Sequence, residues 1–236
     1  MRVRGERTCR NCGATWSYFE TGSIRCPECD SARSTGRGDP TLHTDRSTNL
    51  DLSGPRETAA EGNLDDALQD ASETCLEYIH DRGFIDGGSL RALDESYVHA
   101  QELRHAATLA TSRLELSDAE REYLHTLVAA DPGDRLPAEA VPKQLWAARG
   151  LAVATTVREY RDEMRTYRSE RDDDPRIREL IEPLREHARR IRALDGEVEP
   201  QYADDLLAAA RAVGAYCRDS ENETLQSART AVEQLS

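Results

Sequence analysis

Lysine is almost absent from this chain. Lys143 is the single lysine among 31 basic residues, and the other 30 are arginines. Acidic residues are abundant: 45 Asp and Glu give a formal net charge of −14. High net charge aids solubility, and dissolved salt screens the resulting self-repulsion. This composition favours a halophilic protein from a salt-rich cytoplasm, and a codon bias toward G and C is the alternative reason for arginine in place of lysine.

Long apolar runs are also missing. The most apolar stretch, Gly150 to Val157, is far shorter than the roughly 20 residues of a membrane-spanning helix. The first residues, Met1 to Arg7, are charged, and no apolar stretch of the kind found in secretion signals follows them. We therefore expect a soluble, cytoplasmic protein that has no membrane partner.

Signatures of catalysis are absent as well. The sequence contains no glycine-rich phosphate loop, nucleophile elbow or zincin helix motif. Three Glu-x-x-His pairs would suit a di-iron helical bundle: Glu77/His80, Glu102/His105 and Glu122/His125. At 100° per residue, however, each pair falls mainly on the helix face opposite the apolar stripe. We interpret all three as solvated surface residues and predict no enzyme and no catalytic residues.

What the chain does contain is a set of four cysteines near its start. Cys9 and Cys12 form one C-x2-C pair, and Cys26 and Cys29 form a second. Thirteen residues separate the two pairs. This spacing is typical of a structural zinc site. Thiolates are soft, charged ligands that hold Zn2+ tetrahedrally at about 2.3 Å. Four of them leave no open position for catalysis, so one structural Zn2+ is expected.

Disulfide formation and redox chemistry are the two alternative uses of these cysteines. Disulfides usually mark secreted chains, and no secretion signal is visible. A redox C-x-x-C normally opens a helix within a βαβ pattern, which this region does not show. Both alternatives are less favoured than zinc.

The residues around the cysteines predict a small β zinc ribbon over residues 1–35. Gly13 can take the positive φ that such a turn needs, and Pro27 fixes φ in the second turn. Residues 14–19 are rich in β-forming types, with Trp16 and Tyr18 alternating onto one face. Residues 20–23 then suit a hairpin turn.

Residues 36–62 have a different composition. Breaker clusters stand at residues 36–40 and 53–56, and few apolar residues lie between them. We predict a flexible linker here, which would span roughly 25–30 Å root-mean-square.

Residues 63–236 carry helical periodicity throughout. Apolar stripes predict helices over about 64–78, 93–114, 117–128, 146–167, 177–194, 200–217 and 225–235. A capping box at Ser117–Glu120 and an N-cap at Asp174 before Pro175 mark two of the starts. Cys75 and Cys217 fall on apolar faces and are expected to be buried free thiols. The fold class is therefore mainly α: a ribbon, a linker and an acidic antiparallel bundle of six or seven helices.

The stripe from Trp146 to Tyr167 has the most regular spacing, alternating four and three residues over three heptads. Such a stripe is typical of a helix packed lengthwise on neighbours within one core. The alternative is a seam between two copies of the chain, which would make the protein a homodimer.

The segment Cys9-Arg-Asn-Cys12-Gly13 to Cys26-Pro-Glu-Cys29 resembles the zinc ribbons of transcription factor IIB type. With its acidic, lysine-poor helical body, the whole layout is similar to uncharacterised haloarchaeal zinc-ribbon-containing proteins. The motif resemblance covers about residues 6–34. It implies a ribbon that docks on RNA polymerase or another large assembly.

Three functional hypotheses follow. The first is a protein-docking module whose contacts come from Trp16, Tyr18, Arg10 and Arg25, since aromatic and Arg side chains are favoured interface anchors. For Trp16, an equally weighted alternative is that its ring covers the metal core of the ribbon itself. The second hypothesis is nucleic-acid binding by the ribbon arginines with aromatic stacking, although residues 1–40 hold only seven Arg against five acids. The third is a zinc staple on a helical body with another task.

Overall fold

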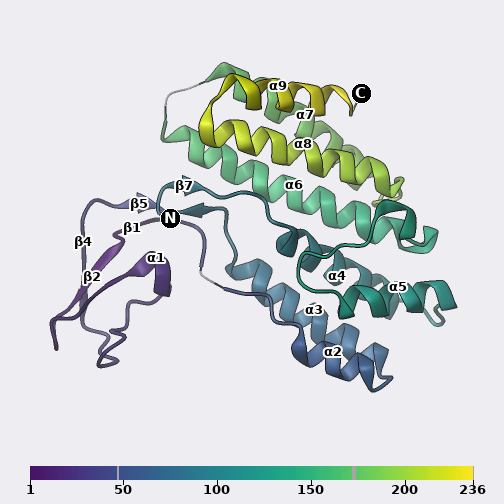
Figure 1. The fold of residues 1–236 in the computed structure, drawn as a ribbon, viewed down its shortest axis with the longest axis horizontal. Coiled ribbons are helices and arrows are strands. Elements are labelled where there is room, and N and C mark those ends of the chain that lie inside the picture. The colour runs from purple at the N-terminus through teal and green to yellow at the C-terminus, as the bar shows by residue number, and fades with distance from the viewer. Residues whose placement is uncertain (47, 172–173, 236) are drawn as a thin grey trace.

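Helices dominate the chain after its first fifty residues (Figure 1). The computed structural model describes residues 1–46, 48–171 and 174–235. Residue 47, within the predicted linker, and residue 236, the end of the predicted helical domain, lie outside the described residues. The helices are α2 (Ser53–Ala60), α3 (Leu64–Asp81), α4 (Glu95–Thr111), α5 (Asp118–Ala129), α6 (Trp146–Ser169), α7 (Pro175–Ala193), α8 (Pro200–Asp219) and α9 (Asn222–Glu233). Two short 3-10 turns, η1 (Ala138–Ala140) and η2 (Lys143–Leu145), precede α6.

The helices α3 to α9 correspond to the seven predicted from periodicity. The capping box of α5 is confirmed, because the Ser117 hydroxyl and the Glu120 carboxylate each accept a hydrogen bond from the other residue's amide. The N-cap of α7 is confirmed too: Asp174 accepts from the Arg176 amide, and Pro175 occupies the first helical position. These local signals set helix starts independently of packing. The antiparallel order of the predicted bundle stays a prediction.

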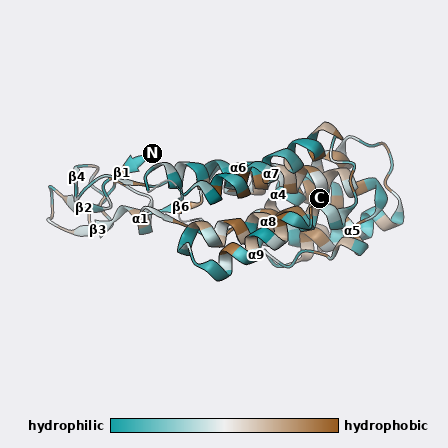
Figure 2. Ribbon diagram, turned by 90° about the horizontal axis from the view of Figure 1, so that it is seen from above, coloured by the Kyte–Doolittle hydropathy of each residue, from teal (hydrophilic) through white to brown (hydrophobic). Residues whose placement is uncertain are grey.

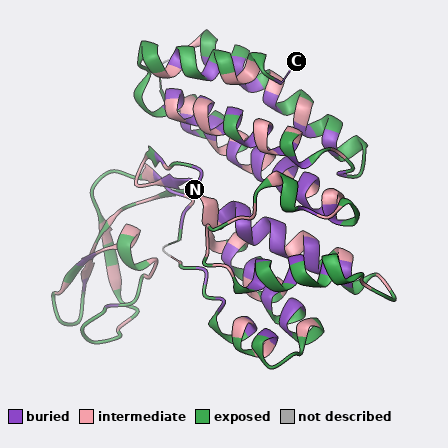
Figure 3. Ribbon diagram, turned by 45° about the vertical axis from the view of Figure 1, so that its right-hand side comes forward, coloured by how far each residue is buried: buried purple, intermediate pink, exposed green. Residues whose placement is uncertain are grey.

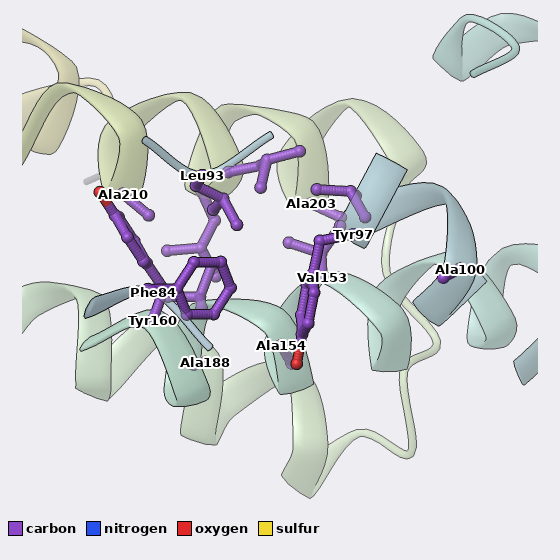
Figure 4. Packing of buried hydrophobic residues seen from close by; sticks show 14 of the residues in the cluster. Phe84, Leu93, Tyr97, Ala100, Val153, Ala154, Tyr160, Ala188, Ala203 and Ala210 are labelled. Atoms are coloured by element: carbon purple, nitrogen blue, oxygen red, sulfur yellow. The ribbon is translucent and has the colours of Figure 1, made fainter. Parts of the chain in front are cut away.

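Helix α6 lies at the middle of the helical body (Figure 1). It packs against α4 on one side and against α7 and α8 on the other, while α3 joins α4 to α2 and α9 covers α8. The predicted stripe faces inward: Val153, Val157, Tyr160 and Met164 are fully buried. Figure 4 shows Val153 and Tyr160 among side chains from several elements. The stripe is thus packed within the chain, with Trp146 at its start half-buried, and the homodimer stays a prediction.

Short strands build the N-terminal part, here called the head (residues 1–40). Strand β2 (Glu6–Cys9) lies between β3 (Thr15–Ser17) and β4 (Ser34–Arg37), and both pairings are antiparallel. The predicted strand is shorter than expected, because residues Tyr18–Thr21 form one helical turn, α1. Trp16 and Tyr18 therefore do not share a strand face. Figure 2 shows the head at one end of an elongated molecule.

The segment predicted as a flexible linker is largely packed in the structure. Strand β5 (Thr41–Leu42) pairs with β1 (Arg2–Val3), and residues 53–60 form α2. Leu50 and Leu52 are buried in the main core. The sequence does not predict this packing, because the apolar residues are few and irregularly spaced and because polar groups make much of the attachment.

The polar attachment centres on residues 43–46. The amides of Thr44 and Asp45 donate to the carbonyl of Ile85, in the small hairpin of β6 (Ile85–Asp86) and β7 (Ser89–Leu90). Asp45 is 2% exposed, and its carboxylate accepts from Arg82 and Arg91 at 2.7–3.1 Å. A buried carboxylate needs such partners to offset its lost hydration. Below, residues 41–46 with the β6–β7 hairpin are called the junction.

A second buried ionic cluster lies deep in the helical body. Glu102 on α4 is 1% exposed and accepts from Arg149 of α6 at 3.0 Å and from Arg135 at 2.9 Å. Tyr123 of α5 also donates to Glu102, and Asp204 of α8 accepts from both arginines. Burial by itself raises the pKa of Glu102, but Arg135 and Arg149 outweigh it and the pKa falls below its ordinary value.

The prediction that Glu102 is a solvated surface residue is therefore wrong. A helix wheel identifies the face opposite the main stripe but not what packs there, and in α4 a second face is covered by α5 and α6. His105 is partly covered as well. The other two Glu-x-x-His pairs, Glu77/His80 and Glu122/His125, are exposed at the surface as predicted.

The two remaining cysteines are free and buried. Burial raises the pKa of the Cys75 and Cys217 thiols to about 12, so both stay protonated and unreactive at neutral pH. Among the described residues, no helix combines the length and the apolar composition that a membrane crossing requires.

Candidate metal centre

Two tight turns in the head bring together the four cysteines that the sequence predicts to bind zinc. Cys9 ends strand β2 and begins the first turn, and the second turn starts at Cys26 between α1 and β4. The thiol sulfurs of Cys9, Cys12, Cys26 and Cys29 all lie within 4.8 Å of one another. Within the part of the chain that the structure describes, this is the one cluster of three or more Cys, His, Asp or Glu residues placed to share an ion.

The two turns repeat one backbone geometry. The Gly13 amide donates to the Cys9 carbonyl at 3.2 Å, and the Asp30 amide donates to the Cys26 carbonyl at 2.9 Å. Gly13 and Asp30 both have positive φ, at 80° and 54°. The sequence predicts this conformation for Gly13 but not for Asp30. Aspartate is one of the few residues besides glycine that adopts it with modest strain.

The spacing between the sulfurs suits a tetrahedral ion. Cys9 and Cys29 place their sulfurs 3.7 Å apart, and Cys12 and Cys26 place theirs 3.5 Å apart. A tetrahedron with metal–sulfur bonds of about 2.3 Å has edges of about 3.8 Å. Cys9 and Cys26 are buried while Cys12 and Cys29 are exposed, so the site lies at the surface of the head with its inner half covered. These residues could hold one metal ion.

Hydrogen bonds around two of the four sulfurs, those of Cys9 and Cys29, favour thiolate. At Cys12 the backbone amide of Ala14 lowers the pKa, but the neighbouring Cys26 and Cys29 outweigh it and raise that pKa to about 12. The pKa of Cys9 is lowered to about 6, first by the backbone amide of Cys12 and also by that of Asn11, which donates at 3.3 Å. The pKa of Cys29 is also lowered, first by the Asn11 side chain. Asn11 thus serves both turns, a role that its position inside the first C-x2-C does not predict. Because metal ligation requires deprotonated thiols, these hydrogen bonds assist it.

Trp16 lies under the cysteines rather than on the outer surface. Its side chain packs with Cys9 and Cys26 in a small core of the head, and the residue is 9% exposed. Its indole N–H donates to the Ser23 carbonyl at 3.0 Å. An interface anchor must be accessible to its partner, so the prediction that Trp16 contacts a partner does not fit its place in the structure. The alternative interpretation, that this ring covers the metal core, fits it.

Tyr18 and its neighbour Phe19 pack toward the junction. Their rings lie 5.9 and 4.8 Å from the buried imidazole of His43. The Phe19 ring also lies close to Gly5 and Gly87. A Cβ added at Gly5 would be 2.2 Å from this ring, and one added at Gly87 would be 3.2 Å from it. The predicted partner-binding role of Tyr18 is thus limited by contacts within the chain.

The two predicted arginines stay at the surface. Arg25 is exposed and lies 3.5 Å from Asp30. Arg10 is exposed, with its Nε donating to the Thr35 hydroxyl at 2.7 Å. Arg10 and Arg33 line a shallow groove of about 540 Å³ beside the first turn, together with Asn11 and Ser34. The sequence places Arg33 among the basic residues of the head but does not pair it with Arg10.

No curated protein and no solved structure matches the chain. One family model matches residues 1–232, a range that includes the cysteine cluster, the junction and nearly all of the helical body. Head and helices thus occur together as one family unit. The chain belongs to DUF7117, a family of unknown function.

Proposed function

We propose that zinc folds the head into an interaction module and that the chain is a non-enzymatic docking protein. The observation that carries this proposal is the convergence of four cysteine sulfurs within 4.8 Å on two matching turns. Zn2+ is the ion that a tetrahedron of four cysteine thiolates most often holds in proteins. With four protein ligands the ion has no open coordination position, so its role is structural.

The small size of the head supports a folding role for the ion. Apart from its cysteines, its apolar core consists of Trp16 with Ala14 packed against it. A core of this size cannot offset the entropy lost on ordering the chain. Metal binding would then supply much of the head's folding free energy.

The face we assign to docking is the groove lined by Arg10 and Arg33. Most residues of the head are exposed (Figure 3), yet its aromatic rings pack against other residues of the chain. Arginine is the remaining residue type of the head that is favoured at interfaces. Resemblance to transcription factor IIB-type ribbons adds a class of partner: a protein assembly such as a polymerase, in a haloarchaeal cytoplasm.

The test is a pull-down from native high-salt lysate with and without nuclease. The baits are the wild-type chain, Cys9→Ser/Cys12→Ser and Arg10→Ala/Arg33→Ala. Two control baits match them: Cys75→Ala/Cys217→Ala changes two cysteines away from the cluster, and Arg4→Ala/Arg37→Ala removes the same charge outside the groove. Zinc content is measured on every bait.

We expect nuclease-resistant recovery of one protein assembly by the wild type and by both controls, and its loss in the two head variants. Recovery that disappears with nuclease would overturn protein docking and favour nucleic-acid binding by the head arginines. Equal recovery by all five baits would mean that the head is only a structural zinc site and that the helices bind the partner.

A further inference from the structure

A groove rich in arginine lies between two helices of the body, away from the cysteine cluster. Its volume is about 530 Å³, and it is formed by the C-terminal half of α6 and the N-terminal half of α7. Six arginines line it against two acids: Arg161, Arg165, Arg168, Arg171, Arg178 and Arg185, with Asp174 and Glu182. The aspartates at 172 and 173 lie outside the described residues and are not counted here.

This concentration of positive charge opposes the rest of the chain. The whole protein has a formal net charge of −14, so an arbitrary surface region should be acidic. Like charges held close together repel, and a groove focuses their field toward an incoming anion. A bound anion would offset that repulsion.

Two of these guanidinium groups keep donors for a ligand. Arg165 is exposed, and among the described residues it has no hydrogen bond or ion pair. Arg185 pairs with Glu182, but both side chains are about half exposed, which makes this pair weak. Arg161 is held by its neighbour Asp162, and Arg168 and Arg178 are engaged by other groups of the chain. Arg165 and Arg185 are therefore the side chains we assign to a ligand.

Two apolar side chains also line the groove. They are Ile177 and Ile181, which are 3% and 6% exposed. The groove therefore combines guanidinium forks, which match phosphate oxygens, with apolar side chains on which a ring can lie. Its volume is within the usual range for small-molecule sites.

We propose that this groove binds a phosphorylated small molecule of the nucleotide class. The phosphates would contact Arg165 and Arg185, and the base would lie over the two isoleucines. The groove is at the end of α6 nearest the head, where Glu170 pairs with Arg2 and Arg171 donates to the Gly88 carbonyl of the junction. The proposal is independent of the metal and of docking.

The test is calorimetric titration of the full-length, metal-loaded chain with ATP, tripolyphosphate and adenosine. Comparing ATP with tripolyphosphate shows how much the nucleoside adds to the binding of the phosphates. Adenosine tests the nucleoside without phosphates. The groove variant is Arg165→Ala/Arg185→Ala. The control Arg189→Ala/Arg192→Ala removes the same charge from exposed positions of α7 outside the groove. Circular dichroism checks that both variants fold.

We expect ATP to bind with a stoichiometry of one, and more tightly than tripolyphosphate or adenosine. The folded groove variant should lose at least about tenfold in affinity, while the control keeps the wild-type value. Three results would each overturn the proposal: no binding of any probe, equal loss in both variants, or binding of tripolyphosphate as tight as that of ATP. If the groove variant does not fold, Arg165→Gln alone, which keeps most of the side chain, provides the same comparison.

Discussion

At the residue scale, one buried carboxylate holds four elements together. Glu102 joins α4 to α6 through Arg149, to α5 through Tyr123 and to the loop before η1 through Arg135. Removing one member of a buried ionic cluster leaves the other charges without partners. The cluster therefore favours one arrangement of these helices over others that would separate the charges.

Glu102→Gln should accordingly lower the free energy of unfolding by about 3–5 kcal/mol, because Arg149 stays buried with less countercharge. Urea unfolding followed by circular dichroism measures this. Glu122→Gln, a change of the same kind at an exposed position of α5, should shift the free energy by no more than about 0.5 kcal/mol. Equal effects of the two substitutions would contradict a structural role for the cluster.

A histidine on the same helix makes stability depend on pH. Burial first, and then the neighbouring Arg104, lower the pKa of His105 to about 4 from an ordinary value of 6.5. Arg104 donates to Nε2 of this ring at 2.9 Å, so the folded ring is neutral. As pH falls from 6.5 toward 4, the unfolded chain binds a proton that the folded chain does not, and stability falls.

His105→Gln should therefore lose less stability than the wild type between about pH 7 and about pH 4.5. Urea midpoints at the two pH values test this prediction. The exposed His125 serves as the control, and His125→Gln should keep the wild-type difference. If His105→Gln also keeps the wild-type difference in stability, groups other than His105 take up the proton.

At the element scale, glycines allow the closest approaches between segments. Gly150 of α6 lies against the turn after α7, where an added Cβ would be 2.2 Å from the carbonyl oxygen of Gly196. The contact is with backbone, which cannot rotate away. The sequence places Gly150 in the apolar stripe of α6 but does not show that its lack of a side chain is needed.

Gly150→Ala should destabilise the protein by about 1–3 kcal/mol, the usual cost of overpacking. Gly54→Ala in α2 is the matched control, because nothing lies within 4 Å of the position that its Cβ would take and alanine is the better helix former. That variant should be neutral or slightly more stable. Thermal unfolding of both variants measures the difference, and a neutral Gly150→Ala would show that the turn moves freely.

The junction is also an element-scale feature. A flexible linker would be cut readily by proteases, whereas much of the segment 41–60 is hydrogen-bonded to the β6–β7 hairpin or packed on the core. Limited proteolysis of the native chain should therefore spare this segment. Asp45→Ala, which leaves Arg82 and Arg91 without their shared carboxylate, should make it accessible. Rapid cleavage of the wild type within residues 41–60 would restore the linker interpretation.

At the scale of the whole molecule, the head and the helices are stabilised by different interactions. The helical body has a large continuous apolar core, whereas the head relies on a few residues around its cysteines. Loss of the proposed Zn2+ should therefore unfold the head and leave the helices folded.

A strong chelator should change the fluorescence of Trp16 while the helical circular dichroism signal falls only slightly. The two tryptophans are separated with Trp16→Phe and Trp146→Phe, since Trp146 lies on α6 away from the cysteines. The response should persist in Trp146→Phe and vanish in Trp16→Phe. A large loss of helical signal on chelation would mean that the body also needs the metal.

The local features of the protein can be predicted from residues that are near neighbours along the chain. The C-x2-C spacing identified the four cysteines, because two residues between thiols suffice to point both at one ion. Periodicity and capping residues located α3 to α9, because helix starts and apolar faces depend on near neighbours.

Which polar residues are buried and which charges meet depends instead on how the elements pack in three dimensions. Asp45 and Glu102 look like surface residues in the sequence, and partners distant along the chain cover and neutralise them. The same holds for Trp16, which lies beneath the cysteines, and for Arg165 and Arg185, which two helices bring to one groove. Burial and charge clustering depend on contacts between remote segments, and no pattern within a single segment records them.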